Sequence, residues 1–265
     1  MTLLLKLVLA PMLVVASSLA GRRWGPGLAG ALVALPIVAG PILFITYLEQ
    51  GRRFVSHAAS ASLLGLVSLA LFAVVFALLS RRRGWTSTLV IGWSACLVAD
   101  LALSFLRLPA VAGLFVSAAA TGTAMRVMSV REAGGERPSA PLPWWDLPAR
   151  AVATGGLVLA LTAAAARLGP GLTGVLAPFP TGTSVVAAFA LVQGGSPTAV
   201  AAMRGVLRGL WGFAVFCFLT ALLAEPLGGS AFVVATAGAL GTQLALRWIS
   251  ARPGGIDRSR PTGYT

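Results

Sequence analysis

The sequence has few charged residues and few side chains able to bind a metal. Only 10% of its 265 residues are charged, whereas soluble domains carry about 25%. A water-soluble protein is excluded, because apolar runs of about 20 residues recur along the chain. The two cysteines, Cys96 and Cys217, lie inside apolar runs, and His57 is the only histidine. These side chains are too few and too scattered for a zinc or iron–sulfur site.

The residues that catalysis requires are also missing. A Ser/His/Asp arrangement would have to use His57, which lies at the rim of an apolar run. The chain has no GxxxxGK[ST] motif with which to bind ATP. An intramembrane protease or a lipid transferase would need paired acids or several histidines. The sequence therefore predicts a protein that is not an enzyme, with no catalytic residues, cofactor or metal.

Apolar residues dominate what remains. They make up 57% of the chain, and the mean hydropathy is +0.89. The net charge of +13 would suggest nucleic acid as the partner of a soluble protein. Here the arginines lie between apolar runs, as membrane topology requires, so we expect lipids and no nucleic acid. We predict an all-α polytopic membrane protein with nine spans, at 2–20, 27–47, 57–80, 86–106, 108–128, 149–167, 171–192, 197–223 and 227–249.

The distribution of basic residues predicts the orientation of these spans. Thirteen of the twenty Lys and Arg residues fall on one side, five on the other, and Arg204 and Arg208 lie within a span. The positive side is cytoplasmic, which places the N-terminus outside and the C-terminus inside a bacterial inner membrane. The expected domains are a first four-helix repeat (1–106), a linker helix with a mobile cytoplasmic loop (107–148), a second repeat (149–251) and a disordered cytoplasmic tail (252–265).

Short motifs recur at a shift of 143 or 144 residues. The segment 23–30, RWGPGLAG, returns as 167–174, RLGPGLTG. The other pairs keep the same order: Leu35-Pro36 with Phe179-Pro180, Gln50-Gly51 with Gln193-Gly194, and 100–103 with 243–246. Because five spans separate the two starts, the repeats are expected to lie inverted across the bilayer. This arrangement is typical of secondary transporters.

Prolines in corresponding spans predict a binding site at the middle of the membrane. Span 27–47 contains Pro36 and Gly40, and span 171–192 contains Pro180. Proline interrupts helix hydrogen bonding, and a break within lipid is tolerated only beside protein or water. A new helix beginning after Pro180 would direct its positive end at an anion, assisted by Thr181, Thr183 and Ser184. A simple kink in each helix is the alternative.

Two charged residues within spans extend this predicted site. Arg208 lies near the middle of span 197–223, where an arginine needs an aqueous cavity, a carboxylate or an anionic ligand. Asp100 occupies a corresponding position to Gln243 in the other repeat. Asp100 can carry a coupling proton or serve as the counter-ion of Arg208. Gly205 and Gly209 form a GxxxG motif that allows another helix to approach closely.

The half-unit resembles a known family. The motifs RWGP, LP and EQG, in that order over residues 3–106 and more weakly over 149–249, are similar to those of the GlpM-like family of small four-helix bacterial inner-membrane proteins. The resemblance implies a half-size ancestor that paired with itself and was later duplicated and fused. It implies no functional residues.

The combined features predict a secondary transporter or facilitator of a small anionic solute. The alternatives are a channel or lipid flippase, and a membrane scaffold or assembly factor that transports nothing. The partners expected are membrane lipids and the solute, and the sequence leaves a homo-oligomer open.

Overall fold

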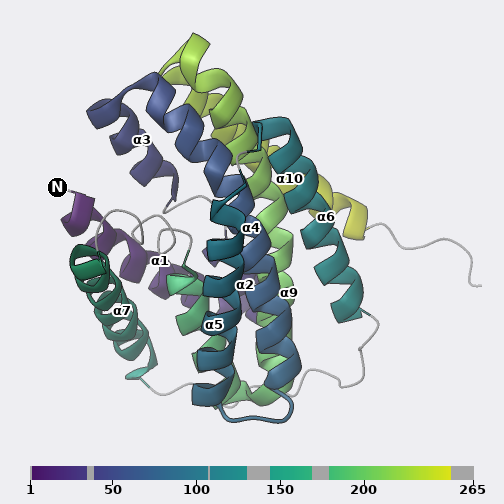
Figure 1. The fold of residues 1–265 in the computed structure, drawn as a ribbon. Helices are drawn as coiled ribbons and strands as arrows, with labels where there is room; N and C mark the ends of the chain where they lie inside the picture. The colour runs from purple at the N-terminus through teal and green to yellow at the C-terminus, as the bar shows by residue number, and fades with distance from the viewer. Residues whose placement is uncertain (1, 35–38, 107, 130–143, 169–178, 252–265) are drawn as a thin grey trace, which may run out of the picture.

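The structure, a computed structural model, describes residues 2–34, 39–106, 108–129, 144–168 and 179–251 (Figure 1). All regular structure in these ranges is helical, which confirms the all-α prediction. The helices are α1 (Thr2–Trp24), α2 (Pro26–Val33), α3 (Ala39–Gln50), α4 (Arg52–Leu79), α5 (Trp85–Ser104), α6 (Ala110–Ser129), α7 (Asp146–Leu168), α9 (Thr181–Leu227) and α10 (Ser230–Ala251). The predicted tail, 252–265, lies outside the described residues, as does most of the predicted loop within 107–148.

Six of the described helices are long and apolar enough to cross a membrane: α1, α4, α5, α6, α9 and α10. Many of their serines and threonines do not interrupt them, because these hydroxyls donate to carbonyls of the preceding turn. Ser62 donates to Ala58, and Thr242 donates to Gly238. The helices therefore define an α-helical membrane protein.

Three predicted spans differ from the helices found. The predicted span 27–47 is divided into the short helices α2 and α3, with residues 35–38 between them outside the described residues. The predicted spans 171–192 and 197–223 are joined in α9, whose described part starts at Thr181. The nine-span topology remains a prediction.

Helix α9 folds back on itself at Gly195. This residue has φ 70° and ψ −170°, a conformation that favours glycine, and Pro197 follows it. Position 182 lies against Val33 and position 209 against Ala34, two neighbours at the end of α2. An unbroken helix would separate positions 182 and 209 by about 40 Å. The two arms of α9, 181–194 and 196–227, thus run back along each other.

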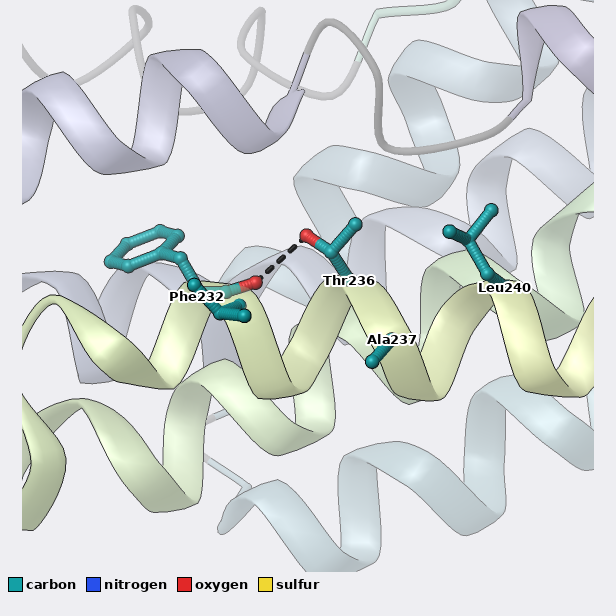
Figure 2. A pocket seen from close by; sticks show the side chains of 5 residues that line it. Phe232, Thr236, Ala237 and Leu240 are labelled. Atoms are coloured by element: carbon teal, nitrogen blue, oxygen red, sulfur yellow. Dashed lines mark hydrogen bonds between the residues drawn. The ribbon is translucent and has the colours of Figure 1, made fainter.

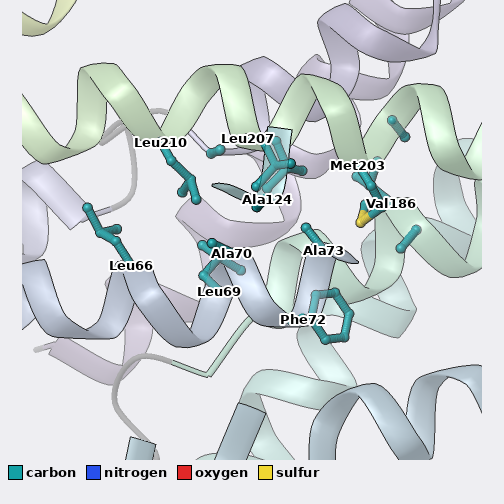
Figure 3. Packing of buried hydrophobic residues seen from close by; sticks show 14 of the residues in the cluster. Leu66, Leu69, Ala70, Phe72, Ala73, Ala124, Val186, Met203, Leu207 and Leu210 are labelled. Carbon is teal, nitrogen blue, oxygen red and sulfur yellow. The ribbon is translucent and has the colours of Figure 1, made fainter. Parts of the chain in front are cut away.

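The core lies between α4 and the second arm of α9. Phe72 and Phe76 of α4 are fully buried, as are Met203, Leu207 and Leu210 of α9. Across the crossing, Leu66, Ala70 and Ala73 of α4 face Met203, Leu207 and Leu210 of α9 (Figure 3). Phe72 lies against Gly92 of α5. The two helices are antiparallel, because Ser80 contacts Ser196 at one end and Ser56 donates to the Ala221 carbonyl at the other.

Glycines bring α2 into backbone contact with α9, as the GxxxG motif predicts. A Cβ at Gly205 would overlap the carbonyl oxygen of Gly27, and one at Gly209 would lie 2.6 Å from the carbonyl oxygen of Ala31. Gly30 makes the reciprocal approach to Ala202. Small residues on both helices therefore fix the position of α2 beside the core.

Candidate functional site

The start of α9 lies in the interior of the bundle. Phe179 and Pro180 are buried, and the first turn continues with Thr183 and Ser184, which are 4% and 1% exposed. A Cβ at position 182 would lie 3.1 Å from Val33 of α2 and 3.4 Å from Val14 of α1. The helix predicted to begin after Pro180 is confirmed, and α1 and α2 surround its start.

Trp93 of α5, which was not predicted as a site residue, contacts the start of α9. The Trp93 indole N–H donates to Ser184 Oγ at 2.8 Å, and its ring lies 5.4 Å from that of Phe179. A tryptophan in the middle of an apolar run was the available signal, since a buried indole N–H needs an acceptor. We call Trp93, Phe179, Thr181, Thr183 and Ser184 the α9-start cluster.

The first-repeat residues of the predicted site are only partly described. Pro36 lies outside the described residues. Gly40 is on α3, where an added Cβ would lie 3.5 Å from the ring of Phe216. Gly40 therefore faces an aromatic side chain of the second arm of α9.

Arg208 and Gln243 form a separate group. The Arg208 side chain is exposed, and its neighbours one turn away on α9 contact α6: Arg204 donates to the Met128 carbonyl, and Trp211 donates to the Met125 sulfur. Gln243 of α10 donates to the backbone carbonyls of Arg208 and Gly209 at 3.1 and 3.2 Å. The structure thus places Arg208 on the side of α9 that faces α6, away from the α9-start cluster.

Asp100 is 5% exposed and is the only charged residue of α5. The Cys96 thiol donates to Asp100 Oδ2 at 3.6 Å, and Ser68 of α4 faces the same carboxylate. The described ion pairs join Asp146 to Arg22 and Arg150, and neither includes Asp100 or Arg208. The counter-ion alternative, Asp100 with Arg208, is therefore wrong for this structure.

The strongest polar cluster centres on Asp146, which the sequence reasoning placed in the loop before the predicted span 149–167. Asp146 is the first residue of α7 and is completely buried. Arg22 of α1 donates to Asp146 Oδ2 at 2.8 Å, and Arg150 donates to Oδ1 at 2.9 Å. Gln193, in the first arm of α9, donates to Oδ1 and accepts from Arg150 at 2.8 Å. These four residues, the Asp146 network, join α1, α7 and α9.

The environment of Asp146 favours its ionised form. Burial would raise the pKa of Asp146, but the hydrogen bonds from Arg22, Gln193 and Arg150 outweigh burial and hold its pKa below the ordinary value. The Arg150 guanidinium also lies over the Phe189 ring, 4.7 Å from its centroid. The network therefore functions as a fixed, fully paired contact between helices.

A depression of about 450 Å³ lies along α10 (Figure 2). One face of α10 lines it, with Phe232, Val233, Thr236, Ala237 and Leu240. The single hydroxyl there, on Thr236, donates to the Phe232 carbonyl of its own helix. This surface offers no free polar group to a solute, and we do not assign the site to it.

No family model matches the chain, and no curated protein or solved structure matches it. The α9-start cluster therefore rests on its own geometry. It places the amino end of a helix and the Thr183 hydroxyl in the protein interior, while the Trp93 indole N–H donates to Ser184 and the Thr181 hydroxyl donates to the Phe179 carbonyl.

Proposed function

We propose that this protein is a secondary transporter of a small anionic solute in a bacterial inner membrane. The observation that carries the proposal is the start of α9, which lies in the interior of the bundle among α1, α2 and α5. The amino end of a helix carries unpaired N–H groups and a partial positive charge. The Thr181 and Ser184 N–H groups donate to the carbonyls of Phe179 and Pro180, so an anion would meet the N–H groups of Gly182 and Thr183. Half-helices of this kind form the sites of many transporters.

The limits of the helices support two equivalent halves. Helix α1 spans 2–24 and α7 spans 146–168, a shift of 144 residues at both ends. The positive-φ glycines Gly51 and Gly195 precede α4 and the second arm of α9 at the same shift. The sequence motifs had aligned Gly51 with Gly194, one residue earlier. A duplicated GlpM-like half-unit would produce this recurrence.

The contacts between the halves support an inverted relation. Pro11 of α1 lies 3.9 Å from a Cβ placed at Gly155 of α7, and these positions are 144 residues apart. Leu66 of α4 points toward Leu210 of α9, which is again 144 residues away (Figure 3). When equivalent residues meet at the crossing of two antiparallel helices, a twofold axis perpendicular to both helices passes between them. Such an axis lies in the membrane plane.

Cysteine labelling tests the inversion at two pairs of exposed positions, one pair at the starts of α5 and α10 and one pair at their ends. Thr86→Cys and Ser230→Cys mark the starts of α5 and α10, and Ser104→Cys and Ile249→Cys mark their ends. In intact cells, an impermeant thiol reagent should label positions 104 and 230, and in inside-out vesicles it should label 86 and 249. The native Cys96 and Cys217, both buried, are the unlabelled reference. Labelling of both members of a pair from one side would contradict the inverted arrangement.

Labelling of Thr181→Cys tests transport without a known substrate. In an alternating-access transporter the site opens to one side at a time, so reagent added to either face should label position 181 in sealed vesicles, while solutes do not leak. A channel should combine labelling with ion conductance. A scaffold should leave position 181 as unreactive as Thr220→Cys, the control at a fully buried threonine of the same helix. An unreactive position 181 would contradict the proposal of a transporter.

A further inference from the structure

We infer that Asp100 is a proton-binding site that couples solute movement to protons. The inference deepens the proposed function and rests on it for the coupling, whereas proton binding by Asp100 can be tested alone. The carboxyl group of Asp100 is buried. Asp100 shares the inward face of α5 with Thr88, Gly92 and Cys96, while Val98 and Leu101 point outward and are exposed.

The groups around Asp100 are neutral. Its neighbours are the Cys96 thiol, a weak donor, and the Ser68 hydroxyl, which donates to the Gly65 carbonyl of its own helix. Helix α4 carries no charged residue after its first two arginines, and His57 near them is exposed. In α9, Arg204 and Arg208 lie on the side facing α6 and Glu225 is exposed. Arg107, after α5, lies outside the described residues.

An ionised carboxylate in these surroundings has no charge to pair with. Burying an unpaired charge is so costly that the group usually binds a proton instead. The Asp146 network shows the contrast within the same chain, because two arginines and a glutamine surround that buried carboxylate. Of these two buried aspartates, one is therefore held ionised and the other is suited to exchange a proton.

The position of Asp100 connects it to the α9-start cluster. Asp100 and Trp93 lie seven residues apart on α5, two turns of helix and about 10 Å along its axis. Trp93 bonds directly to Ser184. Asp100 is also one turn from Ser104, the end of α5 predicted to be extracellular. A proton bound from the outside would make the Asp100 carboxyl group neutral. When Asp100 releases that proton, a movement of α5 would be transmitted to Ser184 through the hydrogen bond from Trp93.

Modification by dicyclohexylcarbodiimide tests proton binding directly. This apolar reagent adds the O–H of a protonated carboxylic acid across its C=N bond, and rearrangement leaves a stable N-acylurea that mass spectrometry detects. We expect an adduct at Asp100 that decreases from acidic to alkaline pH, and none at Asp146. Asp100→Asn should remove the adduct, and Cys96→Ala should retain it. No adduct at Asp100 at any pH, or an adduct independent of pH, would overturn the assignment.

The coupling has its own readout. The side from which Thr181→Cys is labelled should depend on pH, and this dependence should disappear in Asp100→Asn and persist in Asp100→Glu. If position 181 is never labelled, the transport proposal fails while the carbodiimide result stands. If position 181 is labelled from both sides with no effect of pH or of Asp100→Asn, transport remains and proton coupling fails.

Discussion

Asp146→Ala is expected to lower the free energy of unfolding by about 3–5 kcal/mol, the usual cost of removing one partner from a buried ion pair. The substitution leaves Arg150, only 7% exposed, without its carboxylate and removes the acceptor of Gln193. It also removes the ion pair between Arg22 at the end of α1 and the start of α7. The large effect comes from the charge left behind rather than from the strength of the pair itself.

The two native cysteines allow the decrease in stability to be measured. Cys96 and Cys217 are free and buried, so a thiol-reactive dye reports unfolding of the detergent-solubilised protein. Glu49→Ala, at an exposed acid near the end of α3, is the matched control and should change the midpoint little. Joint replacement of Asp146 by Leu and Arg150 by Met should recover most of the loss. An Asp146→Ala midpoint equal to that of Glu49→Ala would show that the network does not stabilise the fold.

The pKa of Asp146 sets the pH range in which this contribution operates. Because its pKa is lower in the folded protein than in the unfolded chain, the stabilisation is fully present above the ordinary pKa of an aspartate. It is lost as the pH falls through the lower, folded value. The wild-type midpoint should therefore decrease on acidification more than that of Asp146→Ala.

Gly205→Ala is expected to destabilise the protein by at least about 1–3 kcal/mol, the usual cost of inserting a methyl group into a packed interior. Here the obstacle is backbone, the carbonyl of Gly27, which cannot rotate away as a side chain can. In a helix without such a contact, alanine is more stabilising than glycine by about 1 kcal/mol. A loss of stability in Gly205→Ala therefore indicates the close contact between α2 and α9.

Gly122→Ala in α6 and Gly241→Ala in α10 are the controls, because nothing lies within 4 Å of a Cβ at either position. They should be neutral or stabilising in the thiol-dye assay. Gly30→Ala should be as harmful as Gly205→Ala, and the double variant less harmful than the sum, since both displace the same helix. Equal midpoints for Gly205→Ala and Gly122→Ala would contradict the close approach of α2.

The sequence predicted the helices well because membrane insertion imposes long apolar runs that are visible along the chain. It also located the start of α9 from Pro180, and a close helix approach at Gly205 and Gly209, since these residues act on their own backbone. It did not identify α2 as the helix that approaches there. The position of Arg208 could not be predicted. Helix periodicity relates Arg208 to Arg204, but only the packed neighbours decide which side of α9 faces α6.

Asp146 was missed for a related reason. It follows Trp144 and Trp145 and precedes a proline, a pattern typical of a connecting segment, and its partners lie far away in the sequence. Arg22 was interpreted as part of the cytoplasmic charge bias, and Gln193 only as part of a repeated motif. Tertiary packing brings Asp146, Arg22 and Gln193 together, and the local sequence around each residue does not indicate this contact.

Two of the four described glycines with positive φ have a mechanical consequence. Gly51 and Gly195 each sit between a short helical segment, α3 or the first arm of α9, and a long core helix. At φ 86° and 70° a side chain would be strained, so both points keep the bare backbone that allows bending. A side chain at either glycine would therefore strain the junction between the short helical segment and the long core helix.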